Sequence, residues 1–336
     1  MKMQPISIRA VASAFPTEVV GNSFFGEGDE SPRAGMFMGA VERRHMAADE
    51  TAVQLIAEAI GKIAAQLGEE TLADVDYILT NVSLPDMPFT GCGAEVARVM
   101  NFAPKGVYDL HNHGCVSFIS MIGLAQSLLT TSGGQRALIC NVQTAAGRVF
   151  ADEEVRKLPQ AAIPGDGCGV ALLEVGGECP VETVTTQCFA ENASDMQISS
   201  PDSRNWWEPG QRQFYVDFSR AKIAKIVARG NQMVPKIVHE ACAQANITPD
   251  QIETLITNQP NPVFLRNWRE ALQIDADKHV DTFQEYGNLF GAGIPVSLER
   301  AQKTGKLKNG TYVVLGGFSH AGDYAAAAVI RWNAAA

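Results

Sequence analysis

One cysteine of the sequence stands where a thiol could act as a nucleophile. Residues 109–115 read DLHNHGC, and the polar stretch gives way after Cys115 to an apolar run, so we expect Cys115 to open a helix. The dipole and free N–H groups of a helix N-terminus stabilise a thiolate, which predicts a pKa below the usual value of about 8.5. His111 and His113 lie nearby, but alternation along a strand would aim both to the same side, and a catalytic role for either is the less favoured interpretation.

The other six cysteines offer no comparable chemistry. The seven cysteines form an odd set, with no CxxC pair and no histidines at zinc-finger spacing, which indicates neither a disulfide framework nor a metal site. Cys140 falls in a predicted strand, Cys242 in a predicted helix, and Cys168 in a glycine-rich turn before a strand. We expect such thiols to pack as small buried apolar groups.

Alternating predicted helices and strands must position Cys115. From Asp49 the chain reads as a capped helix that stops at Gly68, and a strand follows at 76–81. Helical patterns recur at about 117–131, 219–245, 262–272 and 291–302, and strand patterns at 137–142, 168–175, 253–258, 311–316 and 326–332. This alternation is typical of a layered α/β fold.

The second half of the chain repeats the first. YILTN at 77–81 is answered by TLITN at 254–258, a displacement of 177 positions, and each copy continues as strand, polar turn, helix and strand. The first polar turn holds Cys115 and the second holds Asn288. In a duplicated α/β fold these turns can meet around one pocket, which predicts halves at 1–176 and 177–336. Coincidence between common strand sequences is the alternative.

Five motifs together resemble those of the ketoacyl-ACP synthase III family. They are ERR at 42–44, Asp109 through Cys115, PGDGCGVALLE at 164–174, YGN at 286–288 followed by IP at 294–295, and GGFSH at 316–320. The resemblance spans nearly the whole chain and implies a thiolase-like five-layer αβαβα fold and a homodimer. Family members load an acyl group from acyl-CoA or acyl carrier protein onto the cysteine as a thioester and pass it to an acceptor. No permanently bound cofactor is implied.

The sequence departs from the family at a histidine that serves condensation. The family's His-Gln-Ala-Asn motif reads NQPN at 258–261, and the Asn258 amide can donate a hydrogen bond but cannot shuttle a proton near neutral pH. One oxyanion donor is worth roughly 2.7–4 kcal/mol, so a change in its character could suppress condensation without preventing acyl transfer. Asn288 matches the family's asparagine.

An imidazole is found instead in the loop SHAGD at 319–323, where the family places glycines against the nucleophile. We expect His320 to act as the base for Cys115 or for an acceptor hydroxyl or amine, with Asp323 as its orienter. Ala321 and Gly322 of the same loop are expected to contact substrate. The alternative is a histidine satisfied by a loop carbonyl.

Four further residues are predicted to bind substrate. Phe89 matches the place where the family inserts an aromatic side chain into the partner subunit's acyl pocket. Trp206 and Trp207 are expected to form a lid or lining, with an ordinary packed loop as the alternative. Arg33 is the lone cation at 26–35, where the family holds the CoA nucleotide with Trp and Arg, so an acyl carrier protein becomes a candidate donor beside CoA.

Composition limits the partners of the chain. With 336 residues, 46% hydrophobic and 19% charged, it can bury a large core. The net charge is −10 and no Lys/Arg-rich run occurs, so neither nucleic acid nor a membrane surface is an expected partner. No signal core and no bilayer-spanning apolar run are recognised, which predicts a cytoplasmic protein.

The sequence therefore predicts an acyltransferase that loads Cys115 and transfers the acyl group to a hydroxyl or amine, in secondary metabolism derived from polyketides or fatty acids. One alternative is decarboxylative carbon–carbon condensation with malonyl-ACP or a β-keto thioester, in which Asn258 and Asn288 hold the thioester oxygen. Another is an inactive partner subunit of a heterodimeric synthase, against which the intact Cys115 turn argues.

Overall fold

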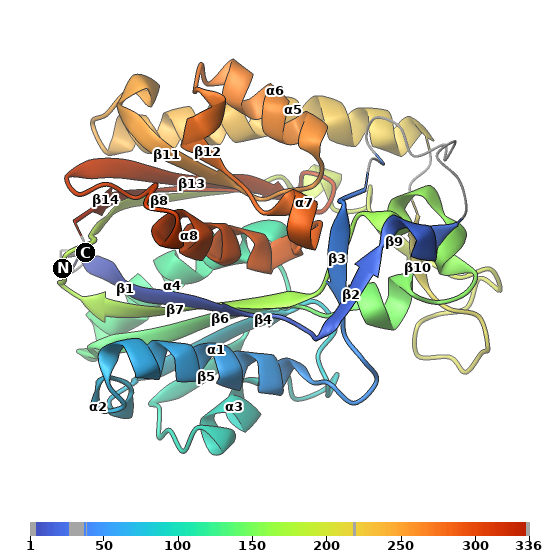
Figure 1. Ribbon diagram of the computed structural model, residues 1–336, viewed down its shortest axis with the longest axis horizontal. Helices are drawn as coiled ribbons and strands as arrows, with labels where there is room; N and C mark the ends of the chain where they lie inside the picture. The colour runs from blue at the N-terminus through green and yellow to red at the C-terminus, as the bar shows by residue number, and fades with distance from the viewer. Residues whose placement is uncertain (1–4, 27–36, 38, 218–219, 334–336) are drawn as a thin grey trace.

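Five layers of secondary structure make up the computed structural model, which describes residues 5–26, 37, 39–217 and 220–333 (Figure 1). Two sheets lie face to face with α4 and α8 between them. Helices α1 and α3 cover the outer face of the first sheet, and α5 and α6 cover the outer face of the second. The predicted αβαβα layering is confirmed. Arg33 lies outside the described residues.

The two sheets have the same strand order and directions. The first runs β1 (Ile6–Ala14), β7 (Gly167–Val175), β6 (Arg136–Gln143), β4 (Tyr77–Val82) and β5 (Gly106–Asp109). The second runs β8 (Val181–Cys188), β14 (Tyr324–Trp332), β13 (Thr311–Ser319), β11 (Ile252–Thr257) and β12 (His279–Val280). In each sheet the last three strands are parallel and the first two pair antiparallel. The duplication predicted from the repeat is therefore present, with β4 equivalent to β11.

The helices and the remaining strands connect these sheets. The helices are α1 (Ala52–Leu67), α2 (Glu70–Ala73), α3 (Gly93–Val99), α4 (Ser117–Ser132), α5 (Arg220–Gln244), α6 (Pro262–Ala271), α7 (Phe283–Tyr286) and α8 (Gly293–Lys303). Two small ribbons pair β2 (Glu18–Gly21) with β3 (Glu42–His45), and β9 (Gln197–Ser199) with β10 (Tyr215–Asp217).

Local chemistry explains where α1 begins and ends. Thr51 caps it, because its side chain accepts the N–H of Gln54 while the Gln54 side chain accepts the N–H of Thr51. The cap thus lies two residues after Asp49, from which the sequence pattern indicated a capped helix. The helix ends at Gly68, whose φ of 91° is unfavourable for residues with a side chain.

Helix α4 occupies the centre of the molecule because it is apolar on nearly all sides. Phe118, Ile119, Met121 and Ile122 are fully buried against the two sheets. The segment Gly114–Ser132 is long and apolar enough to cross a membrane by length and composition, but here it packs as the core helix between the sheets. The residue that precedes this helix is thereby held deep in the fold.

Both described ends of the chain meet its midpoint. Pro180, between the two sheets in sequence, forms a β-bridge with Ser7 of β1 and accepts a hydrogen bond from the Arg331 N–H of β14 at 3.0 Å. Figure 1 shows the start of β1 and the end of β14 at the same side of the molecule. The proposed division at 176 and 177 falls in this crossover and stays a prediction.

Candidate functional site

Cys115 lies in a sharp turn directly before α4. A 3₁₀ turn covers Gly114–Val116, and both His113 and Gly114 have positive φ, 71° and 38°. The half-buried cysteine is therefore at the start of the central helix, where the sequence placed it. Strand β5 ends at Asp109, so the alternation expected for His111 and His113 does not apply to them. His111 lines the cavity described below, whereas the His113 ring packs on Tyr324.

The two equivalent turns meet beside a buried polar network that Ser117 forms with Asn81 and Asn141. The Ser117 hydroxyl donates to Asn81 Oδ1 at 3.0 Å and accepts from Asn141 Nδ2 at 2.7 Å. A Cβ at Gly291, three residues after Asn288, would lie 2.5 Å from Ser117 Oγ, so only glycine permits this approach. The Cys115 turn and the Asn288 turn therefore lie side by side.

One cavity of about 400 Å³ contains both turns. Apolar side chains dominate its wall, including those of Leu84, Val149, Phe150, Ile226 and Phe264. None of the described lining residues is Asp, Glu, Lys or Arg. A largely apolar cavity with a few convergent polar groups is typical of a small-molecule site.

The thiol of Cys115 is neutral in the free protein. Burial raises its pKa to about 12, and the charge of Asp323 adds to this rise. A hydrogen bond from the Asn258 amide and the N–H groups of Cys115 and His320 act in the opposite direction. The expected fall of the pKa is therefore not found for the free protein, because desolvation outweighs the hydrogen bonds to the sulfur. A thiolate forms here only if a base takes the proton.

His320 and Asp323 form an imidazole–carboxylate pair beside this turn. His320 Nδ1 lies 2.9 Å from Oδ2 and 3.1 Å from Oδ1 of Asp323. A carboxylate on Nδ1 favours the tautomer in which Nε2 is free to accept a proton. Burial opposes ionisation of Asp323, but the hydrogen bond and charge of His320 hold the pKa of that carboxyl below its usual value. His320 also lines the cavity.

The Nε2 atom of His320 points at the residue next to the cysteine. A Cβ built on Gly114 would lie 2.7 Å from this Nε2. The structure thus brings Cys115, His320 and Asp323 together at one side of the cavity, while the roles of nucleophile, base and orienter stay a prediction.

Ala321 and Gly322 face away from the cavity. Arg229 Nη1 donates to the Ala321 carbonyl at 2.9 Å, and Asn192 Nδ2 donates to the Gly322 carbonyl at 2.8 Å. Neither Ala321 nor Gly322 is among the residues that line the cavity. They do not line the cavity because long-range hydrogen bonds hold this part of the loop against α5, and their contact with substrate stays a prediction.

The two asparagines differ in how they are held. Asn258 is fixed by Phe318, whose N–H it accepts at 3.2 Å and whose carbonyl it bonds at 3.1 Å, and its amide also reaches the Cys115 thiol. Asn288 Oδ1 accepts the Phe290 N–H at 3.0 Å, and its Nδ2 has no hydrogen-bond partner among the described residues. Both side chains line the cavity, so Asn288 can still offer a donor to a bound carbonyl.

Three predicted substrate-binding residues do not line the cavity. Phe89 is 91% exposed. Trp206 and Trp207 are 63% and 66% exposed and contact each other edge to face at 5.8 Å, in the loop between β9 and β10. They form neither a closed lid nor a lining of this cavity.

Two features of the site were missed from the sequence. Asn81, the counterpart of Asn258 in the repeat, lines the cavity and donates to the carbonyls of Leu110 and Asn112 at 2.8 and 3.2 Å. The repeat itself could have indicated it, since YILTN and TLITN end on these two residues. Strand β10 also lines the cavity, but three residues are too few for a periodic signal.

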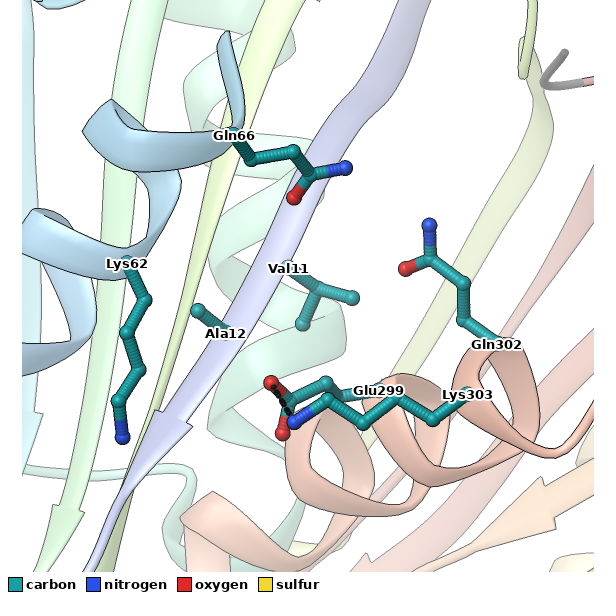
Figure 2. Close-up of a pocket in the computed structure, with 7 residues that line it drawn as sticks. All are labelled: Val11, Ala12, Lys62, Gln66, Glu299, Gln302 and Lys303. Atoms are coloured by element: carbon teal, nitrogen blue, oxygen red, sulfur yellow. Dashed lines mark ion pairs between the residues drawn. The ribbon is translucent and has the colours of Figure 1, made fainter. Parts of the chain in front are cut away.

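A second hollow lies between α1 and α8 over β1 (Figure 2). Its charges are already paired, because Lys303 contacts Glu299 at 2.7 Å and Lys62 contacts Glu58 at 2.8 Å. No group of three potential metal ligands lies together in the described part of the chain. This hollow therefore offers no reactive group comparable to those beside Cys115.

Comparison with known proteins points to one family. Residues 242–332 match the family model described as 3-oxoacyl-[acyl-carrier-protein (ACP)] synthase III C terminal. The chain is 27% identical over 303 residues to a beta-ketoacyl-[acyl-carrier-protein] synthase III of Synechococcus sp. (strain RCC307), covering 87% of each protein. It is 23% identical over 280 residues to the same enzyme of Thioalkalivibrio sulfidiphilus, covering 83% of this chain and 84% of that one.

Solved structures share the fold. The beta-ketoacyl synthase III of Thermus thermophilus aligns with a TM-score of 0.80 at 23% identity, covering 98% of this chain and 100% of that one. The priming beta-ketosynthase of the R1128 polyketide pathway aligns with a TM-score of 0.83 at 17% identity, covering 99% and 98%.

Proposed function

We propose that this chain, which belongs to the ketoacyl-ACP synthase III-like family, loads an acyl group onto Cys115 and transfers it to an acceptor hydroxyl or amine. The observation that carries this proposal is the His320–Asp323 pair, whose free Nε2 faces the turn of a neutral, buried thiol. A buried thiol needs a base within reach, and this imidazole is oriented as one.

Loading begins when Cys115 Sγ attacks the carbonyl carbon of the donor thioester. The thiol proton passes to His320 Nε2, the Sγ–carbon bond forms, and the donor's carbon–sulfur bond breaks as its thiol leaves with that proton. In transfer, His320 takes the proton of the acceptor O–H or N–H and the acceptor bonds to the acyl carbon. The Sγ–carbon bond breaks, and Sγ takes the proton from His320, which restores the neutral thiol and the free imidazole. We expect the Asn288 amide, which lines the cavity, to stabilise the oxyanion in both steps.

Two observations favour transfer over condensation. Asn258 cannot shuttle a proton, and Phe318 fixes its carboxamide on both sides. A malonyl carboxylate would also meet no Lys or Arg side chain among the described cavity residues, which makes its burial costly. Condensation in which Asn258 and Asn288 hold the thioester oxygen is the second candidate, favoured by the unengaged Asn288 amide.

The donor we propose is a CoA or phosphopantetheine thioester, the latter carried by acyl carrier protein, with no permanent cofactor. A cytoplasmic role in polyketide or fatty-acid-derived secondary metabolism fits the similarity to a priming ketosynthase of a polyketide pathway. An inactive partner subunit remains the third candidate, but it would have no need of a base aligned with its cysteine turn.

The first experiment separates loading from transfer. Intact-mass spectrometry with a panel of acyl-CoA and acyl-ACP donors should show one acyl group on the wild-type protein and none on Cys115→Ala. His320→Ala should keep at least part of the loading but lose transfer, under single-turnover conditions with an acceptor found by screening alcohols and amines, by about 10²–10⁴-fold. His239→Ala, on the exposed face of α5, is the matched control.

Outcomes that contradict the proposal are equally distinct. Full transfer by His320→Ala, or an acyl group that maps to Cys92 or Cys168, would reject the assigned roles. Carbon dioxide release from malonyl-ACP that survives in His320→Ala but not in Asn288→Ala would support condensation instead. Asn258→His should raise decarboxylation if the missing imidazole is what suppresses it.

A further inference from the structure

We propose that His113 is a positioning residue whose ring, packed on Tyr324, ties the Cys115 turn to the loop that carries His320. The inference rests on the proposed function, because it concerns how the base is held against the nucleophile. His113 itself is not assigned a proton-transfer step.

The contact joins residues adjacent to the reacting groups. The ring centroids of His113 and Tyr324 lie 4.3 Å apart at an angle of 37°. His113 precedes Cys115 by two residues, and Tyr324 directly follows Asp323. The contact therefore links the segment that carries the nucleophile to the segment that carries the orienting carboxylate.

The His113 ring is also fixed to α4. Its Nδ1 lies 3.0 Å from the hydroxyl of Ser120, one turn into that helix. The ring thus has two partners from different elements, Ser120 on the core helix and Tyr324 on β14. Because α4 is buried between the sheets, it provides a rigid reference for both loops.

The loop that carries His320 must also be restrained on the side that faces the Cys115 turn. Arg229, Asn192 and Phe189 bond its carbonyls at Ala321, Gly322 and Asp323, and none of these three partners belongs to the Cys115 turn. Toward the turn, the His320 ring lies beside Gly114, which has no side chain, and the backbone N–H of His320 bonds the Cys115 thiol. The His113–Tyr324 contact is the ring packing that opposes withdrawal of the loop toward α5.

The backbone at His113 fits this interpretation. Its φ of 71° lies in the left-handed region, where a residue with a side chain persists only if its surroundings hold it. The two ring contacts supply that restraint. Cys115 follows this turn, so the direction of its thiol depends on the restraint as well.

Electrostatics favours packing over proton transfer for His113. Burial lowers the pKa of the ring, the charge of His320 lowers it further, and Asp323 acts in the opposite direction. His113 therefore stays neutral near pH 7 and leaves the Asp323 carboxylate to His320. Of the two histidines near Asp323, His320 therefore acts as the base and His113 supports it.

The test measures the rate at which iodoacetamide alkylates Cys115 across pH 6–10, which requires no knowledge of the acyl donor. His113→Asn keeps a residue that tolerates positive φ but removes the ring. We expect it to slow alkylation at neutral pH by about 10- to 100-fold, the range in which small misplacements act, and to move the pH profile to higher pH. Tyr324→Phe keeps the ring contact and should alkylate like the wild type, whereas Tyr324→Leu should resemble His113→Asn.

The outcomes separate this inference from the proposed function. If His320→Ala slows alkylation while His113→Asn and Tyr324→Leu match the wild type, the positioning role is rejected and the proposed function stands. If His320→Ala leaves the profile unchanged, the base assignment itself fails. Should His113→Asn fail to fold, Tyr324→Leu and Ser120→Ala test the same ring from its two partners, and wild-type profiles in both would overturn the inference.

Discussion

Gly114 is the residue on which the placement of His320 depends most directly. A Cβ at this position would lie 2.7 Å from the Nε2 atom, and the backbone has a φ of 38°. We predict that Gly114→Ala displaces the imidazole and slows acyl transfer by about 100-fold, since an error near 1 Å is enough for such a loss. Single-turnover transfer from the acyl-enzyme is the measurement.

A matched variant separates crowding from backbone strain. Gly133 also has a positive φ, 68°, but a Cβ there would meet nothing within 4 Å. Gly133→Ala should therefore carry the backbone cost without touching transfer. Equal transfer rates in the two variants would show that Gly114 has no special relation to His320.

At this scale the sequence predicts which residues belong to the site better than it predicts their surroundings. The position of Cys115 before a helix could be predicted, because a polar turn followed by an apolar run marks it. The rise of its pKa could not, because desolvation depends on what packs around the sulfur. The outward direction of Gly322 was also inaccessible, since its partner Asn192 lies 130 positions away.

Two short strands each carry a buried neutral histidine. His279 on β12 pairs its Nε2 with Thr257 Oγ1 of β11 at 3.0 Å, and burial lowers its pKa to about 4. On β3, burial and the charge of Arg43 lower the pKa of His45 to about 4. Strands this short depend on such side chains, because their ladders contain few hydrogen bonds.

This predicts an acid-sensitive fold. The unfolded chain takes up protons at these histidines below about pH 6.5, while the folded chain resists until about pH 4, so stability is present above 6.5 and is lost between 6.5 and 4. In urea titrations, His279→Gln should show a shallower loss of unfolding free energy over this window than the wild type. His239→Gln on α5 should not differ from the wild type, and equal slopes for all three would contradict the prediction.

Element boundaries followed the strength of the periodic signal. The long elements β4, α4 and α8 lie where the pattern placed them, because buried strands and helices repeat apolar residues over many positions. The β9–β10 ribbon was not predicted, although β10 lines the cavity. Three-residue strands are set by tertiary pairing rather than by local pattern.

On the scale of the whole molecule, exposed apolar side chains near α3 suggest a covered face. Phe89 is 91% exposed and Met87 55%, in the loop before that helix, and Tyr108 on the edge strand β5 is 42% exposed. Large apolar groups gathered at a sheet edge are typical of association. We propose that a second copy of the chain covers them, as the family resemblance implies.

Sedimentation at micromolar concentration should then give twice the 36.1 kDa mass of one chain. Phe89→Asp should shift the protein toward monomer, because it places a charge in the proposed interface. Trp206→Asp, at a comparably exposed aromatic residue of the β9–β10 loop, should leave the mass unchanged. A monomeric wild-type protein would exclude the homodimer, and a stable complex with a sister chain would favour the heterodimeric alternative.

The duplication was visible in the sequence because two similar five-residue strand sequences, one in each half, are followed by turns at matching positions. How the halves face each other was not, since the approach of Gly291 to Ser117 belongs to no local pattern. This approach brings the two similar turns together in one site.

The meeting of both chain ends with the crossover at Pro180 makes the fold a closed circuit. Opening the circuit beside Pro180 and joining Ile6 to Trp332 by a short linker would yield a circular permutant. Every strand of that permutant would keep its neighbours, although the half with the base would be translated before the half with the nucleophile. The fold therefore does not depend on which half comes first in the sequence.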